Sequence, residues 1–341
     1  MRRMTCKDVL LLNFGGPETT DDVEIFLRNL FSDTFGIRFG TPAFFQRFLA
    51  KKISKRRAPS VAEKYDEIGG GSPLVPTTKA LVNSLSLELP DLNFHIAMRY
   101  TPPYTEDVIL DLYRKGVKDL LLLPLYPHFS YATTGSSFYA IAQTIRELQI
   151  SPSQMRFRSI CCFFENENYI KAQVEMVKRG LQKIPQDLET VLLFSAHGIP
   201  EKYVEQGDPY QHQIQTSVEH IVKTLNWTGE YQLAYQSRVG PQKWLDPDVE
   251  EVLKTYQNTK KALLIIPISF VSDHIETLHE LDIEYREIAE ECNIEHYYRA
   301  PVFNEDPIFV RCLKDLIEEE LNKSSCNWRG CYAAISALNA K

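Results

Sequence analysis

The chain has 341 residues, a length typical of two globular domains with sizeable cores. Asp and Glu outnumber Lys and Arg by 45 to 38, and this net charge of −7 disfavours nucleic-acid binding, which usually requires a strongly basic domain. Hydrophobic residues make up 44% of the chain and charged residues 24%, which excludes a disordered, collagen-like or small disulfide-stapled protein.

Membrane-spanning and targeting segments are also missing from the pattern. No apolar run approaches the ~18 residues that a membrane-spanning helix needs. The run Val9–Leu12 is not followed by the small-residue cleavage site of a signal peptide. We therefore expect a cytoplasmic protein in a reducing compartment, whose seven cysteines are thiols or metal ligands rather than a disulfide framework.

Short apolar runs alternate with amphipathic stretches along the chain. The apolar runs predict strands at Val9–Phe14, Phe94–Arg99, Asp119–Leu125, Thr190–Ser195, Gln232–Gln236 and Ala262–Ser269. The amphipathic stretches predict helices at Thr20–Phe31, Lys79–Glu88, Tyr104–Lys115, Phe138–Leu148, Tyr169–Leu181, Gln211–Leu225, Pro247–Tyr256, His274–Cys292 and Pro307–Asn322. Apolar strands separated by helices indicate βαβ units and a parallel sheet covered on both faces.

An internal repeat divides the chain. Phe94–Ser130 and Tyr231–Asp273 each contain a strand, a turn with proline, a helix, a Lys-rich turn, and an apolar strand that ends in proline and a polar loop. The openings VLLLNFGG at Val9 and VLLFSAHG at Val191 also match. A repeat of ~140 residues indicates a domain duplication. We expect two similar α/β domains at 1–165 and 166–322, followed by a tail at 323–341.

The ends of the predicted strands are candidate site positions, because open parallel sheets bind ligands beyond the carboxyl ends of their strands. With two such domains, the expected site is the cleft between them. The strand-end residues are Asn13, Phe14, Arg99, Tyr100, Tyr126, His197, Gln236–Arg238 and Ser269–Asp273. GGPET after the first strand lacks GxGxxG spacing and no P-loop occurs, which disfavours a nucleotide-dependent enzyme.

Two strand-end features suit proton or metal chemistry. His197 can serve as a general base near neutral pH, or simply as a hydrogen-bonding loop residue. Asp273, Glu276, Glu280 and Glu284 lie at offsets 0, 3, 7 and 11, which places them on one stripe of an α-helix at ~100° per residue. Such a row suits protons or hard divalent cations, and it equally suits a solvated acidic face.

Aromatic residues gather near the same strand ends and in one basic segment. Phe14, Tyr100, Tyr126, Trp244 and Phe270 suit a slot for a flat hydrophobic ligand, or ordinary loop packing. The segment Phe44–Arg57 combines Phe and Leu residues with six Lys and Arg residues. That combination is typical of peripheral contact with an anionic membrane, and also of a surface helix with a basic end.

Four cysteines offer a weaker signal. Cys161 and Cys162 are adjacent, and Cys326 and Cys331 stand close together near the C-terminus. Four thiols are the usual ligands of a [2Fe–2S] cluster. The CxxxxC spacing by itself favours free thiols.

Several long motifs resemble those of ferrochelatases, which insert Fe²⁺ into a porphyrin late in haem synthesis. They run from about Val9 to Phe309 and read LLNFGGPET, RRAPSVAEKYDEIGGGSP, LYPHFSYATTGSS, LFSAHGIP, QGDPY, QSRVGPQKWLDP and PISFVSDHIETLHELDIEY. The resemblance implies two Rossmann-like, chelatase-type domains around a cleft. It also implies a lyase that forms protohaem from Fe²⁺ and protoporphyrin IX.

The resemblance further implies roles for individual residues. His197 matches the histidine that accepts pyrrole protons or binds the metal, and Glu276 matches its partner across the porphyrin. The resemblance also implies an acidic row that passes protons or metal, and a pocket that binds the porphyrin. In this pocket, Phe14 stands where other members carry Met, Tyr or another bulky residue. The row comprises Asp273, His274, Glu280 and Glu284, and the pocket comprises Phe14, Arg99, Tyr100, Tyr126, Trp244 and Phe270. Phe44–Arg57 matches the pocket lip, which favours membrane contact.

Alternatives remain at this stage. Cluster-bearing ferrochelatases use a Cys-rich tail and one distant Cys, whereas Ser324, Ser325 and Tyr131 stand where such cysteines are expected. Cys161 or Cys162 would have to substitute. One alternative substrate is coproporphyrin III. A second alternative is a related chelatase that inserts Co²⁺ or Ni²⁺ into another tetrapyrrole, and a third is a tetrapyrrole carrier without turnover.

Overall fold

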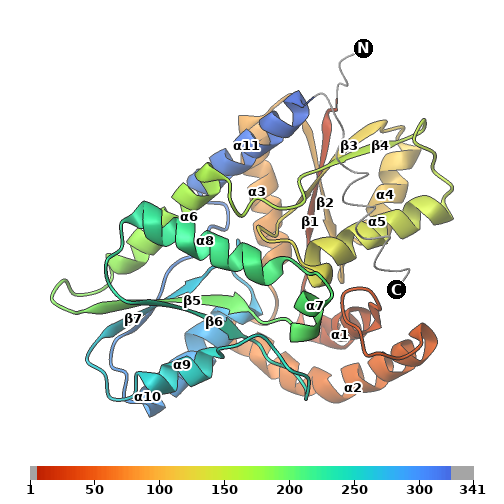
Figure 1. Ribbon diagram of the computed structural model, residues 1–341. Helices are drawn as coiled ribbons and strands as arrows, with labels where there is room; N and C mark the ends of the chain where they lie inside the picture. The colour runs from red at the N-terminus through yellow and green to blue at the C-terminus, as the bar shows by residue number, and fades with distance from the viewer. Residues whose placement is uncertain (1–5, 324–341) are drawn as a thin grey trace. The chain divides into compact units, whose positions relative to one another are not determined.

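The computed structural model describes residues 6–323, which divide into two compact units (Figure 1). Unit 1 contains the residues up to Cys162 together with those from Glu305 onward, and unit 2 is Phe163–Asn304. In the described part of the chain, no helix is long and apolar enough to cross a membrane.

Unit 1 contains a parallel four-stranded sheet in the order β2-β1-β3-β4. Its strands are β1 (Asp8–Asn13), β2 (Asn93–Met98), β3 (Asp119–Pro124) and β4 (Arg156–Ser159). All of β3 and all of β1 after Asp8 are buried, as expected for Leu-rich strands covered on both faces. Leu10, Leu12, Leu120 and Leu122 form one core with residues of the helices that follow β2 and β3.

In chain order, the helices of unit 1 are a 3₁₀ turn (Thr20–Asp22), α1 (Val23–Ser32), α2 (Ala43–Glu67), α3 (Leu74–Glu88), α4 (Thr105–Arg114), a π-helical segment (Tyr131–Gly135), α5 (Ser136–Glu147) and α11 (Pro307–Asn322). The capping box of Thr19 and Asp22 begins the first of them. Helices α3, α4 and α5 of unit 1 lie beside this sheet, and α2 packs on α1 (Figure 1).

Unit 2 repeats this plan with a parallel sheet in the order β6-β5-β7-β8. Its strands are β5 (Thr190–His197), β6 (Tyr231–Gln236), β7 (Ala262–Pro267) and β8 (Tyr297–Arg299). Its helices are α6 (Glu167–Leu181), α7 (Glu201–Glu205), α8 (Tyr210–Leu225), α9 (Val249–Thr255), a π-helical segment (Glu276–Glu284) and α10 (Tyr285–Glu291). The predicted pair of parallel α/β sheets is therefore confirmed.

The strand order explains where a site can form in each unit. The chain passes from the first strand to a neighbour on one side, and then crosses to the strand on the other side. The loops that leave β5 and β7 therefore diverge, and a ligand site forms beyond the carboxyl ends of such strands. In unit 2 these two loops carry His197 and the residues Ser269–Asp273.

Three features of the fold differ from the expected elements. The short edge strands β4 and β8 were not predicted, because RFRS and YYR lack an apolar run. The helix α2 spans 25 residues and continues through Pro59. The single α-helix expected at His274–Cys292 is wrong, because Glu276–Glu284 is π-helical before α10 begins. Residues four apart lie near one face in both windings, so the i, i+4 spacing of Glu276, Glu280 and Glu284 does not separate the two.

The division of the chain also differs from the expected boundary at 322. The last helix, α11, belongs to unit 1, where it packs along α3 (Figure 1). Lys314 on α11 pairs with Glu88 at 3.0 Å, and the buried Arg158 of β4 donates to the carbonyls of Glu320 and Lys323. The C-terminal helix thus returns to cover the first sheet.

Candidate active site

His197 is the last residue of β5, and its ring is half-buried. Its backbone N–H donates to Ser269 Oγ at 3.0 Å, and its carbonyl accepts from the Tyr210 hydroxyl at 2.9 Å. Ring atom Nδ1 lies 2.7 Å from the Gly198 carbonyl oxygen, which can only accept, so the neutral ring carries its proton on Nδ1. Nε2 then presents a lone pair, as a general base requires.

Gly198 is required by the close packing beside this histidine. A Cβ at this position would lie 2.8 Å from the Gln236 carbonyl oxygen and 3.4 Å from the Trp244 ring. Trp244 is half-buried, and its indole N–H has no hydrogen-bond partner among residues 6–323. A buried donor without a protein partner is typical of a group that faces a ligand or water.

Phe270 connects His197 to the π-helical segment of unit 2. Its ring meets both imidazoles edge-on, with centroids 6.3 Å from His197 and 4.4 Å from His274. His274 Nε2 lies 3.2 Å from Glu276 Oε2. Burial lowers the pKa of His274, although Glu276 opposes this effect. His274 is therefore a neutral imidazole beside a carboxylate, an arrangement that can hold or pass a proton.

Glu280 lies one turn further along the segment and is largely buried. Its carboxylate accepts from Ser237 Oγ, from Gln236 Nε2 at 2.8 Å and from the Tyr285 hydroxyl at 3.2 Å. Burial raises the pKa of Glu280, and the hydrogen bonds from Ser237 and Gln236 oppose the increase. A carboxyl with a raised pKa exchanges protons more readily near neutral pH than an exposed one.

Glu284 continues the acidic row towards the surface. Its Oε2 lies 3.7 Å from Nδ1 of the buried His279. Glu280 and Glu284 also line an open hollow whose walls are predominantly acidic. The other lining residues are Arg238, Asp248, Glu250, Tyr285, Glu287, Ile288 and Glu291. This hollow holds a concentrated negative charge that attracts cations.

Asp273, the first acid of the row, is held in a different way. Its carboxylate contacts Arg299 Nη1 at 3.2 Å and accepts from Thr277 Oγ1 at 3.0 Å and Asn304 Nδ2 at 2.9 Å. Its backbone N–H donates to Asn304 Oδ1 at 2.8 Å. Of the four predicted acids, Glu276, Glu280 and Glu284 lie in the π-helical segment, whereas Asp273 precedes it and is committed to structural partners.

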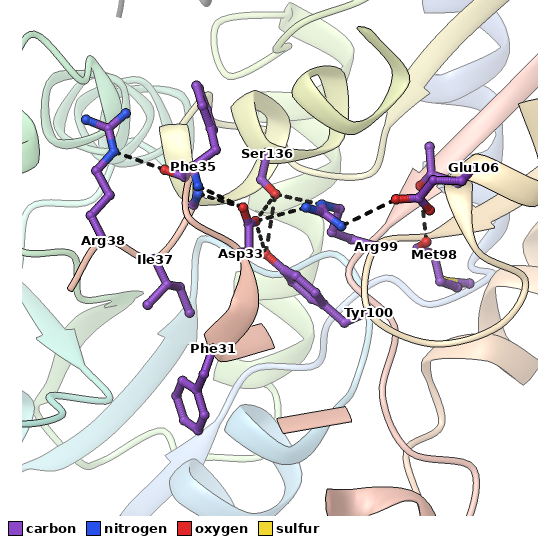
Figure 2. A network of polar contacts seen from close by, with 12 residues as sticks. Phe31, Asp33, Phe35, Ile37, Arg38, Met98, Arg99, Tyr100, Glu106 and Ser136 are labelled. Carbon is purple, nitrogen blue, oxygen red and sulfur yellow. Dashed lines mark hydrogen bonds and ion pairs between the residues drawn. The ribbon is translucent and has the colours of Figure 1, made fainter. Parts of the chain in front are cut away.

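In unit 1, Arg99 and Tyr100 belong to a buried polar network centred on Asp33 (Figure 2). Asp33 Oδ2 accepts from the Tyr100 hydroxyl at 2.8 Å and from Ser136 Oγ, and lies 3.3 Å from Arg99 Nη2. Arg99 Nε donates to Ser136 Oγ at 2.8 Å. Burial raises the pKa of Asp33, but Arg99, Ser136 and Tyr100 together hold it below its ordinary value.

The network places the predicted pocket residues of unit 1 at different depths. Tyr100 is only 1% exposed, and its ring packs edge-on against Phe14 at 4.6 Å between centroids. Phe14 and Tyr126 are half-buried at the ends of β1 and β3, and burial raises the pKa of the Tyr126 hydroxyl. Phe14 and Tyr126 therefore have surface available for a ligand, while Tyr100 supports Phe14 from behind.

Comparisons with known proteins identify the family of this chain. The ferrochelatase family model matches residues 7–321. The ferrochelatase of Rippkaea orientalis is 42% identical over 329 residues, covering 94% of this chain and 84% of the relative. That of Trichodesmium erythraeum is 44% identical over 323 residues, covering 93% and 83%. The chain belongs to the ferrochelatase family. It is therefore a porphyrin metal chelatase, a lyase whose Fe²⁺ is a substrate.

A solved structure supports the fold of this ferrochelatase. SirB from Bacillus subtilis with Fe³⁺ has a TM-score of 0.56 and 10% sequence identity, covering 95% of this chain and 97% of SirB. At this identity the likeness concerns the fold alone. It agrees with the two Rossmann-like sheets that the sequence predicted.

Of the four expected [2Fe–2S] ligands, only Cys161 and Cys162 lie among the residues that the structure describes. Cys161 and Cys162 are half-buried, and Cys161 packs against the apolar core of unit 1. Cys326 and Cys331 lie outside the described residues. Within residues 6–323, no group of three or more His, Cys, Asp or Glu side chains is arranged to hold a metal ion.

Several residues that support the candidate site were not predicted from the sequence. Asp33 lies in the turn after α1 and Ser136 begins α5, far from any predicted strand end. Arg299 is the last residue of β8, a strand that the apolar pattern did not reveal. Ser237 was among the strand-end candidates, and its positive φ of 66° places it in a left-handed turn. These residues matter because they carry or contact carboxylates of the candidate site, and the sequence does not show which residues will be in contact.

Proposed function

We propose that this ferrochelatase inserts Fe²⁺ into protoporphyrin IX to form protohaem, with His197 as the first acceptor of a pyrrole proton. The free Nε2 of His197, fixed by the Nδ1 contact with the Gly198 carbonyl, carries this proposal. The reaction removes two N–H protons from the ring as Fe²⁺ enters. A base held in one tautomer at a strand end suits the first of these transfers.

The second part of the proposal concerns the acidic row. Glu276 acts with His197 as a metal ligand and proton carrier. His274, Glu280 and Glu284 continue the path for protons or Fe²⁺, while Asp273 anchors the chain at its inner end. The raised pKa of Glu280 and the acidic hollow beyond it support this role, because protons and divalent cations both follow carboxylates.

The porphyrin side of the proposal rests on aromatic surface. Each unit offers aromatic surface for the macrocycle, with Phe14 and Tyr126 in unit 1 and Trp244 and Phe270 in unit 2. The indole N–H of Trp244, which has no hydrogen-bond partner among residues 6–323, supports a polar contact with the ring. Arg99 and Tyr100, held by Asp33, support the pocket residues from behind. Binding energy from the rest of the ring can hold the porphyrin bent, which exposes its nitrogen lone pairs to the metal.

An anaerobic metalation assay tests the proposed function. Purified protein is mixed with protoporphyrin IX and Fe²⁺ while the visible spectrum is recorded, with coproporphyrin III in a parallel reaction. Conversion of the free-base bands of protoporphyrin to a haem spectrum is expected. Faster conversion of coproporphyrin III would overturn the substrate assignment, and a bound but unchanged porphyrin would indicate a carrier.

We also propose peripheral membrane contact through Phe44–Arg57 of a cytoplasmic protein. On α2, Phe44, Phe45 and Phe48 are 76%, 42% and 53% exposed. Lys52 Nζ lies 4.6 Å from the Phe48 ring centroid. Both residues line a shallow hollow on α2, together with Lys51, Lys55 and Arg56. Exposed aromatic rings beside basic side chains bind anionic lipid surfaces.

The [2Fe–2S] cluster is a separate hypothesis that requires Cys326 and Cys331. Iron and sulfide analysis of the purified protein, together with its own visible spectrum, tests it directly. Substoichiometric iron and sulfide after anaerobic purification would remove the cluster from the proposal. The metalation chemistry above does not depend on this result.

A further inference from the structure

One guanidinium holds both ends of the π-helical segment of unit 2. Arg299 Nε donates to Asp282 Oδ1 at 2.8 Å, and Nη2 donates to Asp282 Oδ2 at 2.7 Å. The third nitrogen, Nη1, lies 3.2 Å from Asp273 Oδ1. Asp273 precedes the segment and Asp282 lies near its end, so Arg299 connects two points nine positions apart.

The Asp273 end of this connection is reinforced by its neighbours. Asn304 donates to Asp273 Oδ2 at 2.9 Å and accepts from the Asp273 backbone N–H at 2.8 Å. Thr277, inside the segment, donates to Asp273 Oδ1 at 3.0 Å. Both carboxylate oxygens of Asp273 are therefore engaged, which suits an anchor better than a proton relay.

The geometry and burial make this a strong attachment. The Arg299 side chain is 12% exposed, and the side chains of Asp273 and Asp282 are 23% and 30% exposed. Paired parallel N–H···O bonds between a guanidinium and a carboxylate are roughly twice as strong as neutral hydrogen bonds. A lysine ammonium keeps the charge but cannot reproduce the planar fork.

A π-helical stretch needs such support, because this winding is rare and follows i→i+5 rather than i→i+4 hydrogen bonds. A change to α winding would rotate the side chains within the segment relative to His274. We infer that Arg299 is a positioning residue, which keeps the segment π-helical through Asp273 and Asp282 and so aims Glu276 and Glu280. This inference deepens the proposed function and rests on it for its catalytic consequence.

The test is a double-mutant cycle on Arg299 and Asp282, followed by activity and amide hydrogen exchange. Arg299→Met and Asp282→Asn are each expected to lower kcat about tenfold or more. The double variant should be no slower than the worse single variant, because residues in one contact act non-additively. Arg299→Lys should lose less than Arg299→Met. The KM for porphyrin should change by less than about threefold, since Arg299 acts on the orientation of the acids.

Hydrogen exchange separates this inference from the proposed function. In Arg299→Met, amides of Glu276–Glu284 should exchange at least about tenfold faster, while amides of β5 and β7 remain unchanged. The matched control is Arg179→Met, which removes an arginine from an exposed pair with Glu175 on α6 and should alter neither readout.

The outcomes are distinct. Unchanged amide exchange in Glu276–Glu284, or additive losses in kcat, would overturn the inference that Arg299 holds the segment. Faster exchange with normal kcat would overturn its positioning role. A wild-type protein that inserts no metal would instead refute the proposed function, and the exchange result would still decide whether Arg299 holds the segment.

Discussion

Replacing Asp33 with asparagine tests the buried network of Figure 2. The substitution keeps the side-chain shape and removes the negative charge beside Arg99. The Arg99 and Asp33 side chains are 15% and 2% exposed, so the guanidinium would remain buried without its main counterion. Breaking one member of a buried ion pair typically costs about 3–5 kcal/mol.

Two local features reduce this cost. Glu106 Oε1 lies 4.0 Å from Arg99 Nη1 and partly compensates the positive charge. Asparagine at position 33 can still accept from the backbone N–H groups of Phe35 and Gly36, which now donate to Asp33 Oδ1 at 2.9 and 3.1 Å. We therefore expect Asp33→Asn to lower the free energy of unfolding by about 2–4 kcal/mol.

The assay is urea and thermal unfolding of both proteins between pH 3 and pH 8. A loss of this size lowers Tm by about 5 °C or more. The native pKa of Asp33 is lowered, so its stabilisation is present above the unfolded pKa of about 3.9 and disappears as pH falls through the native value. The difference between the proteins should be constant from pH 5 to pH 8 and shrink below pH 4.

The matched control is Asp111→Asn on α4. Asp111 pairs with Lys115 at 2.6 Å, but the two side chains are 57% and 64% exposed. Water screens such a pair, so its loss should change stability by less than about 0.5 kcal/mol. If Asp33→Asn is equally mild, or if its effect does not change with pH, the reasoning about this network is wrong.

Four further outcomes are expected. His197→Ala should abolish metal insertion while porphyrin still quenches protein fluorescence on binding; normal turnover would remove its role as base. Glu276→Gln should lower the insertion rate at least ~100-fold, and a few-fold change would leave only a structural role. Glu280→Gln should slow insertion and remove the fall in rate at low pH, because wild-type Glu280 becomes protonated there; a profile identical in shape would contradict the relay. Phe48→Ser with Phe44→Ser should weaken co-sedimentation with phosphatidylserine vesicles at unchanged metalation in solution, whereas equal binding would locate the contact elsewhere.

The sequence predicted those parts of the fold that depend on continuous apolar runs. Strands β1, β3, β5 and β7 are such runs, and each lies in the middle of its sheet with both faces covered. The edge strands β4 and β8 carry arginines such as Arg158 and Arg299, whose hydrogen-bond partners lie far away in the sequence. Sequence periodicity contains no information about those partners.

The candidate site was predicted in part for similar reasons. His197 and the acids after β7 follow from the rule that ligands meet the carboxyl ends of parallel strands. The support of Arg99 and Tyr100 by Asp33 joins residues 66 and 67 positions apart, and no local pattern marks it. The return of α11 to unit 1 was missed because adjacency in sequence favoured the second domain.

The π-helical winding of Glu276–Glu284 also has a consequence for sequence change. A turn closed by an i→i+5 bond contains one residue more than the α-helical turn it replaces. Removing one residue would allow the α pattern to resume, and the side chains within the segment would then take the directions of an α-helix. Substitutions that spare Asp282 keep the number of residues in each turn, whereas a change in length does not. A library that explores metal or porphyrin preference here should vary residue identity and keep the number of residues fixed.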